Sequence, residues 1–158
     1  MMKIMSKQEK GRVLWEDEEQ TVRESLEAAV RAKAYLSEAD LGEADLEGAN
    51  LGEADLWGAD LEGANLGRAN LGRANLGGVN LWAADLRGAN LGGANLEKVT
   101  LWGANLSEAN LWRANLEGAN LGGADVREAN LWGANLGEAN LGRQDLDGIA
   151  LVQRVRTG

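Results

Sequence analysis

The amino-acid sequence predicts an all-β solenoid, a rod formed by one short repeat that coils on itself. Three observations support this prediction: a strict period of five residues, leucine at the third position of nearly every repeat, and glycine only at the last two positions. The composition agrees, because Phe, His, Cys and Pro are absent while Gly reaches 22 of 158 residues. An ordinary globular core does not have this composition, and the length suits one domain.

The repeat runs from Ala34 to Gln153 in 24 blocks of five residues. The first position is almost always Ala, the second is almost always Asp or Asn, and the third is Leu except where Val126 stands. The exceptions at the first two positions are Val79, Val99, Gln144, Ile149, Tyr35, Thr100 and Ala150.

Neither regular secondary structure accommodates this spacing. On an α-helix, leucines five residues apart step by about 140° and scatter around the helix. On a flat strand they alternate between the two faces of the sheet. Glycine at the fourth and fifth positions, as in Gly77 and Gly78, indicates a turn in every block, because glycine accepts the positive φ of tight turns. Leucine and alanine can then point inward together.

The tandem motif A-[DN]-L-x-x over residues 34–153 resembles the pentapeptide repeat family. This resemblance implies a right-handed quadrilateral β-helix with four blocks per coil, and so about six coils for this chain. At a strand spacing of roughly 4.8 Å, such a rod is about 29 Å long. The absence of central Phe and of loop insertions indicates a straight rod, produced by recent duplication or by consensus design.

Residues 1–33 are expected to form a tail and a capping helix. Thr21 and Glu24 fit a capping box, while Arg31 and Lys33 suit the negative end of the helix dipole. The apolar residues Val22, Leu26, Ala29 and Val30 share one face of this helix. We therefore expect a helix over about 22–33 that covers the first coil.

At the other end only the tail 154–158 follows the repeats. Its neighbourhood carries a small apolar group with Arg154 and Arg156 beside it. Such charges commonly protect a sheet edge, which is one interpretation. The other is a homodimer through the C-terminal coil, formed by Ile149, Leu151, Val152 and Val155.

The net charge of −9 arises in one segment. Residues 34–66 carry nine acidic and no basic residues, whereas the segments on either side are balanced. Solubility is the simplest explanation. This segment also supplies the acidic candidates for an interaction surface: Glu43, Asp45, Asp55, Asp60 and Glu62.

Two further interpretations of the acidic segment remain. Family members that protect type II topoisomerases such as gyrase are acidic rods that mimic DNA, so binding of gyrase or another DNA-binding protein is the alternative function. Mimicry along a whole rod requires charge along its whole length, which this chain lacks. Asp40 and Asp60, twenty residues apart, also form a candidate pair for a cation such as Ca²⁺.

Tryptophans occupy the outward fourth position at intervals that indicate stacking. One pair, Trp82 and Trp102, and a second pair, Trp112 and Trp132, are each twenty residues apart, which is one coil. Counting blocks places the two pairs on opposite faces. They either shield the glycine corners or anchor a protein partner, since exposed Trp is enriched at binding hot spots.

The sequence does not favour catalysis, because a filled rod without His or Cys offers no concave site with tuned acids and bases. We therefore expect a non-enzymatic structural or protein-interaction scaffold without cofactor, whose partner the sequence does not identify. A designed scaffold without a partner stays open. The chain shows no long apolar segment, so we expect a cytoplasmic protein with neither membrane insertion nor direct nucleic-acid binding.

Overall fold

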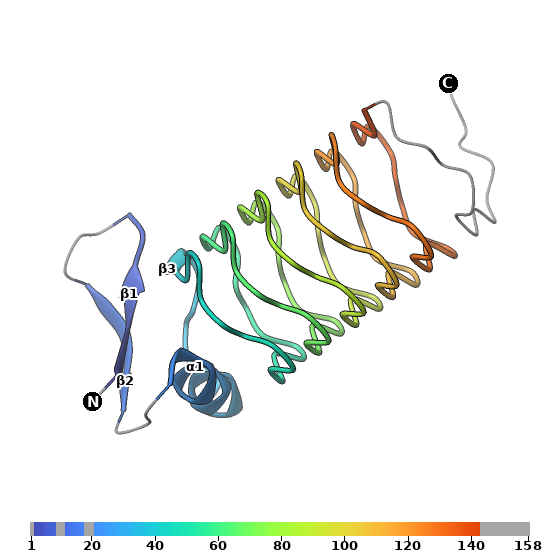
Figure 1. The fold of residues 1–158 in the computed structure, drawn as a ribbon. Helices are drawn as coiled ribbons and strands as arrows, with labels where there is room; N and C mark the ends of the chain where they lie inside the picture. The colour runs from blue at the N-terminus through green and yellow to red at the C-terminus, as the bar shows by residue number, and fades with distance from the viewer. Residues whose placement is uncertain (1, 9–11, 18–20, 143–158) are drawn as a thin grey trace.

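The computed structural model of the protein describes residues 2–8, 12–17 and 21–142. The repeats wind into a stack of coils along one axis, and the other elements gather at the N-terminal end of this stack (Figure 1). In chain order, these elements are β1 (Met2–Ser6), β2 (Val13–Asp17), α1 (Val22–Arg31) and β3 (Ala39–Asp40).

Each coil contains four blocks, as predicted. Parallel β-bridges join residues twenty apart, from Asp40 and Asp60 to Asn120 and Asn140. Backbone hydrogen bonds join the same coils: the Leu41 N–H donates to the Asp60 carbonyl at 2.8 Å. The predicted sixth coil would span 134–153, and its residues after 142 lie outside the described part of the chain.

The corner of each block from residue 34 to residue 139 is a four-residue turn. In the turn from Leu41 to Ala44, the Ala44 N–H donates to the Leu41 carbonyl at 3.2 Å, and the third residue, Glu43, has a φ of 58°. A positive φ at the third residue of the turn identifies type II geometry. The same positive φ recurs at every fifth position from Glu38 to Glu138, whether or not the residue is glycine. The turn therefore constrains the fifth position throughout this range.

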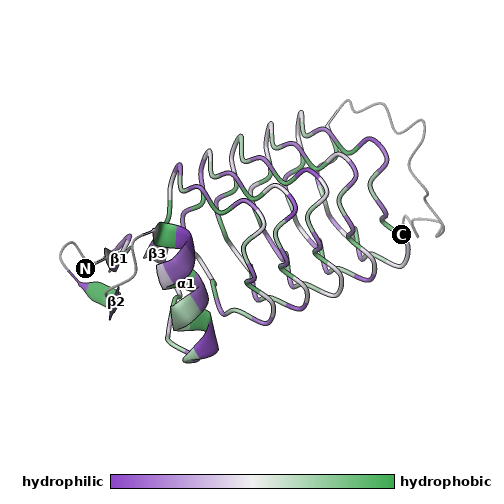
Figure 2. Cartoon of the chain, turned by 60° about the horizontal axis from the view of Figure 1, so that its bottom comes forward, coloured by the Kyte–Doolittle hydropathy of each residue, from purple (hydrophilic) through white to green (hydrophobic). Residues whose placement is uncertain are grey.

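The first and third positions of the blocks form the core. Leucines such as Leu46, Leu66 and Leu86 are fully buried, and so are Val79 and Val99 in place of alanine. Figure 2 shows apolar and polar residues alternating along the coils. The inward orientation predicted for Leu and Ala is confirmed.

The helix α1 begins with the predicted capping box. The Glu24 N–H donates to the Thr21 side chain, and a Glu24 carboxylate oxygen accepts the Thr21 N–H at 3.1 Å. The helix ends at Arg31 instead of Lys33, and Lys33 has a φ of 55°, which a helix cannot continue. Leu26 is buried, so the apolar face is covered.

Two polar side chains attach α1 to the first coil, alongside which it lies in Figure 2. Glu27 accepts the backbone N–H of Asn50 at 2.7 Å, and Arg23 donates to the carbonyl of Glu47 at 3.1 Å. These bonds satisfy groups at a coil edge that has no earlier coil beneath it. The helix therefore covers part of this edge.

The residues before α1, expected to be a tail, instead contain a hairpin. β1 and β2 pair antiparallel, with Ile4 opposite Trp15, and Ile4 is buried. β1 also pairs with β3, with Met5 opposite Asp40, and so continues the first coil as a sheet. Among the described residues, no helix is long and apolar enough to cross a membrane.

Two predictions for the C-terminal end fall on residues outside the described part of the chain. They are the tail 154–158 and the dimer contact of Ile149, Leu151, Val152 and Val155. The homodimer stays a prediction.

Candidate interaction surfaces

Side chains twenty residues apart lie in one column along the rod, because twenty residues complete a coil. The outward columns come from the second, fourth and fifth positions of the blocks. The surface is therefore described column by column.

Asparagines at the second position form ladders of side-chain hydrogen bonds. The Nδ2 of Asn70 donates to Oδ1 of Asn50 at 3.0 Å, and the bond repeats from Asn90 to Asn70, Asn110 to Asn90 and Asn130 to Asn110. Each Oδ1 from Asn50 to Asn130 also accepts the N–H two residues later in its own block. Sequence reasoning recorded Asn at this position but assigned the asparagines no role.

Aspartates begin several of these ladders. Asp45, Asp55 and Asp60 each accept, through Oδ1, the side-chain amide of the asparagine twenty residues later, at 3.1, 2.9 and 3.0 Å. A first rung needs only to accept, so a carboxylate fits there as well as an amide. The acidic excess of residues 34–66 therefore has, in part, a structural role.

Two later aspartates interrupt one ladder and pair with arginine instead. Arg87 donates through Nε to Oδ1 of Asp85 at 2.9 Å and through Nη2 to Oδ2 at 2.5 Å, and Arg127 contacts Asp125 in the same way. The hydrogen-bonded guanidinium of Arg87 lowers the pKa of Asp85, and Arg127 lowers the pKa of Asp125.

The candidate cation pair lies as predicted, with Asp40 and Asp60 bridged on adjacent coils. Lys7, which follows β1, places its Nζ 3.5 Å from Oδ2 of Asp60. The chain thus supplies a cation to this pair. Within residues 2–8, 12–17 and 21–142, no group of three or more Asp, Glu, His or Cys side chains could hold a metal ion.

The tryptophans form the two predicted stacks. Trp82 and Trp102 have parallel rings with centroids 5.9 Å apart, and the Trp112 and Trp132 centroids are 6.3 Å apart. Each of these four residues is between 39% and 49% exposed. The columns are half a coil apart, so the stacks lie on opposite faces. We call them the Trp82–Trp102 ladder and the Trp112–Trp132 ladder.

The two ladders differ in what lies over their rings. The guanidinium carbon of Arg113 is 4.4 Å from the centroid of Trp112 and 5.9 Å from that of Trp132. In the Trp82–Trp102 ladder, the residues after each tryptophan are Ala83 and Gly103, which have no long side chain. Only the Trp112–Trp132 ladder therefore has an arginine supplied by its own turn.

Glu62 continues the column of the Trp82–Trp102 ladder, and Asp60 and Glu43 lie in the two columns beside it. A carboxylate oxygen of Glu62 accepts Nδ2 of Asn80 at 3.1 Å, and Oδ1 of Asn80 accepts the N–H of Trp82 at 3.2 Å. The same Asn80 amide donates to Asp60 at 3.0 Å. One coil earlier, the backbone N–H of Glu43 donates to the Glu62 carbonyl at 2.7 Å.

We name Glu43, Asp60, Glu62, Trp82 and Trp102 the acidic tryptophan corner. The structure brings together five predicted residues that the sequence had placed in two separate groups. The other four lie elsewhere: Asp45 and Asp55 line grooves beside α1, and Trp112 and Trp132 are on the opposite face.

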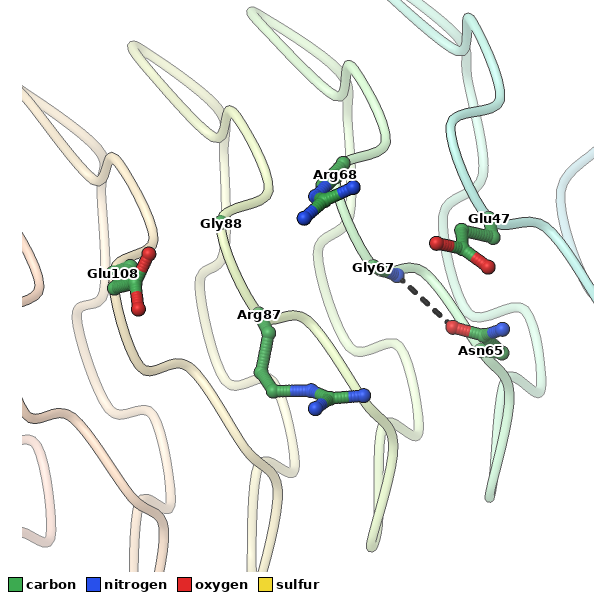
Figure 3. Close-up of a pocket in the computed structure, with 7 residues that line it drawn as sticks. All are labelled: Glu47, Asn65, Gly67, Arg68, Arg87, Gly88 and Glu108. Atoms are coloured by element: carbon green, nitrogen blue, oxygen red, sulfur yellow. Dashed lines mark hydrogen bonds between the residues drawn. The ribbon is translucent and has the colours of Figure 1, made fainter.

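A shallow groove of about 260 Å³ lies along two other adjacent columns, where glycines leave space between charged side chains (Figure 3). Glu47, Arg68, Arg87 and Glu108 come from four successive coils and are balanced in charge. Its remaining lining residues are Asn65, Gly67 and Gly88. Sequence reasoning missed this groove because the count by segment separated its residues: Glu47 fell in the acidic segment 34–66, and Arg68, Arg87 and Glu108 fell in the balanced part that follows.

Comparison with known proteins gives solved structures with the same type of repeat. A pentapeptide repeat protein from the Arabidopsis thaliana thylakoid lumen is 35% identical, with a TM-score of 0.48, over 60% of this chain and 63% of that one. Rfr23 from the cyanobacterium Cyanothece 51142 is 38% identical, with a TM-score of 0.45, over 61% of this chain and 59% of that one. The chain thus spans less than two thirds of the length of either.

A third similar structure is QnrB1, a plasmid-mediated fluoroquinolone resistance protein, at 24% identity and a TM-score of 0.31, over 71% of this chain and 74% of that one. No curated protein gives a significant match. The family pattern of pentapeptide repeats matches in eight copies, over residues 32–68, 64–103, 94–133, 104–143 and 127–148. Because these matches cover most of the chain, the protein belongs to the pentapeptide repeat family.

Proposed function

We propose that the protein is a non-enzymatic scaffold that binds a protein partner through the tryptophans on its β-helix. The observation that supports this proposal is the pair of exposed Trp ladders, each held in parallel stacking. Tryptophan is among the residues most enriched at binding hot spots, and exposed apolar groups on a soluble surface mark interaction sites.

The ladders are ordered before any partner arrives. Trp82, Trp112 and Trp132 each donate their backbone N–H to the asparagine two residues earlier, at 3.1 to 3.2 Å. The rings also stack on one another. A partner therefore meets side chains that lose little rotamer freedom on binding, which lowers the entropic cost of association.

A scaffold role also suits the rest of the surface. Carboxylates such as Asp45 and Asp55 accept ladder hydrogen bonds, and Asp85 and Asp125 pair with arginine. Members of this family are generally structural or interaction proteins. A cytoplasmic location is part of this proposal, and fractionation of the source cells tests it.

Retention of partners on the immobilised protein tests the function. We expect wild-type protein to retain specific proteins from a lysate of the source cells, and Trp82→Ala/Trp102→Ala or Trp112→Ala/Trp132→Ala to lose them. Quantitative mass spectrometry compares the retained proteins. If both double variants remain folded by circular dichroism and retain the same proteins as wild type, the proposal is wrong.

The alternative is an acidic mimic of DNA that binds gyrase or another DNA-binding protein. The acidic excess of residues 34–66 favours it. Lys7, Arg23 and Arg73 reduce this excess, because they contact Asp60, the Glu47 carbonyl and Glu53. A gyrase supercoiling assay separates the two functions: the scaffold leaves supercoiling and its inhibition by fluoroquinolone unchanged, whereas a mimic alters one of them in proportion to its concentration.

A further inference from the structure

We infer that the acidic tryptophan corner binds an arginine-bearing segment of a protein partner, with a guanidinium placed against the Trp82–Trp102 ladder. This inference rests on the proposed function, because it names the partner chemistry for one of the two ladders. Three features of the described residues support it.

The first feature is a contact that the chain makes with itself on the opposite face. Arg113 lies with its guanidinium carbon 4.4 Å from the centroid of Trp112, within the range of a cation–π interaction. A planar guanidinium suits such stacking better than an ammonium group does. A Trp ladder on this fold thus accommodates an arginine side chain.

The second feature is the open space beside Trp102. Gly103 follows Trp102 as Arg113 follows Trp112, and a Cβ at Gly103 would meet no atom within 4 Å. One coil later, Trp102 lies directly over Gly122, whose Cβ position is 2.8 Å from Cδ1 of Trp102. Gly103 therefore adds no side chain beside Trp102, while Gly122 packs against the Cδ1 edge of the ring; Trp102 is 49% exposed.

The third feature is charge complementarity. Glu43, Asp60 and Glu62 are anionic, and between residues 40 and 142 the columns that contain this corner hold no Lys or Arg. Lys7, which follows β1, pairs with Asp60, so Glu43 and Glu62 are the carboxylates left to contact a cationic partner. A cationic partner is steered toward such a surface, whereas an acidic partner is repelled.

Binding of fluorescein-labelled hexa-arginine to the full-length protein tests this inference by fluorescence anisotropy. We expect Trp82→Ala/Trp102→Ala to weaken binding by about fivefold, the size of one cation–π contact at an exposed site. The matched control, Trp112→Ala/Trp132→Ala, should change binding by less than about twofold. Thermal unfolding by circular dichroism confirms that each variant is folded.

A second variant fills the site without removing a tryptophan. Gly103→Arg places an arginine directly after Trp102, as Arg113 directly follows Trp112, and the φ of 68° at Gly103 is close to the 54° that Arg113 adopts. We expect this variant to bind hexa-arginine at least about fivefold more weakly. Gly78→Arg is the control, because it adds the same charge in equally open space at another corner.

Hexa-arginine binding that is unchanged by Trp82→Ala/Trp102→Ala, or reduced equally by Gly103→Arg and Gly78→Arg, overturns the inference, since charge alone then accounts for it. No binding of hexa-arginine overturns it as well. In each case the proposed function stands if proteins from the lysate still depend on either ladder. If none does, the proposed function itself fails.

Discussion

At the scale of single residues, much of the backbone strain in this fold lies at the fifth position of the blocks. Non-glycine residues such as Glu43, Ala83 and Lys98 adopt φ values of 54° to 58°. The left-handed region costs an L-amino acid roughly 1 kcal/mol or more, whereas glycine adopts it freely. The many non-glycine residues at this position show that packing between coils outweighs the local strain.

Gly78→Ala isolates this strain. Gly78 has a φ of 66°, and an added Cβ meets nothing within 4 Å, so the substitution introduces backbone strain without a clash. We expect the free energy of unfolding to fall by about 1 kcal/mol, measured by chemical denaturation.

Gly42→Ala is the matched control for Gly78→Ala. Gly42 is the fourth residue of its block, and its backbone is not in the left-handed region. An added Cβ would lie 3.8 Å from the Glu62 carbonyl oxygen, which is an ordinary contact distance. We expect it to be neutral or to stabilise by up to about 0.5 kcal/mol, because the unfolded chain loses freedom. Equal destabilisation by both substitutions would show that the turn imposes no strain.

At the scale of elements, the asparagine ladders have a direction, since each Nδ2 donates to the preceding coil. Asn90 both donates to Asn70 and accepts from Asn110. Asn90→Asp removes the donor and sets a carboxylate against the Oδ1 of Asn70. We expect a loss of about 1 to 2 kcal/mol in the free energy of unfolding at pH 7. The loss should shrink at acidic pH, where the introduced carboxyl can be protonated and donate.

Asp85→Asn makes the opposite change in another column. It returns an amide to a position above Asn65 and removes the exposed pair with Arg87. Because Arg87 lowers the Asp85 pKa from its usual 3.8, the pair contributes stability above that pH and loses it as the pH falls through the lowered pKa. We therefore expect Asp85→Asn to be nearly neutral at pH 7 and to become relatively more favourable below pH 4. A large loss at pH 7 contradicts this account of the ladders.

The coils could be predicted from the sequence because every block repeats nearly the same pattern of apolar, polar and turn residues. The spacing of 20 residues places Trp82 beside Trp102. The hairpin of β1 and β2 could not be predicted in this way. Met2–Ser6 and Val13–Asp17 are short, and β1 pairs with β3, an edge that exists only once the first coil has formed. The run Val13-Leu14-Trp15 was the one available signal, since such residues favour strands.

The candidate site was predicted in pieces. The acidic residues and the tryptophans were found by counting, but their union into one corner depends on the hydrogen bonds of Asn80 to Asp60 and Glu62. The position of Arg113 over Trp112 depends on the turn geometry at the fifth position, which the spacing of tryptophans does not reveal. For this site, the sequence left the directions of the side chains undetermined.

At the scale of the whole molecule, the four-block coil lets the surface residues vary while the backbone fold stays the same. The core and turns are nearly the same in every block that the structure describes, so the rod tolerates different surface residues at the fourth and fifth positions. The faces therefore differ in chemistry while the backbone stays constant: one has the acidic tryptophan corner, and the opposite one has the Trp112–Trp132 ladder with Arg113.

This constancy makes the five-residue block a unit of rotation. Loss of one block between Glu62 and Trp82, such as residues 64–68, would preserve the inward pattern of Leu and Ala but turn every later side chain by a quarter of the circumference relative to α1. Trp82 would leave the column of Glu62, and the corner would be lost from an intact rod. Gain or loss of four blocks would instead lengthen or shorten the rod and keep its faces aligned. Sequence changes in multiples of twenty thus conserve a binding face, and changes of five, ten or fifteen create new ones.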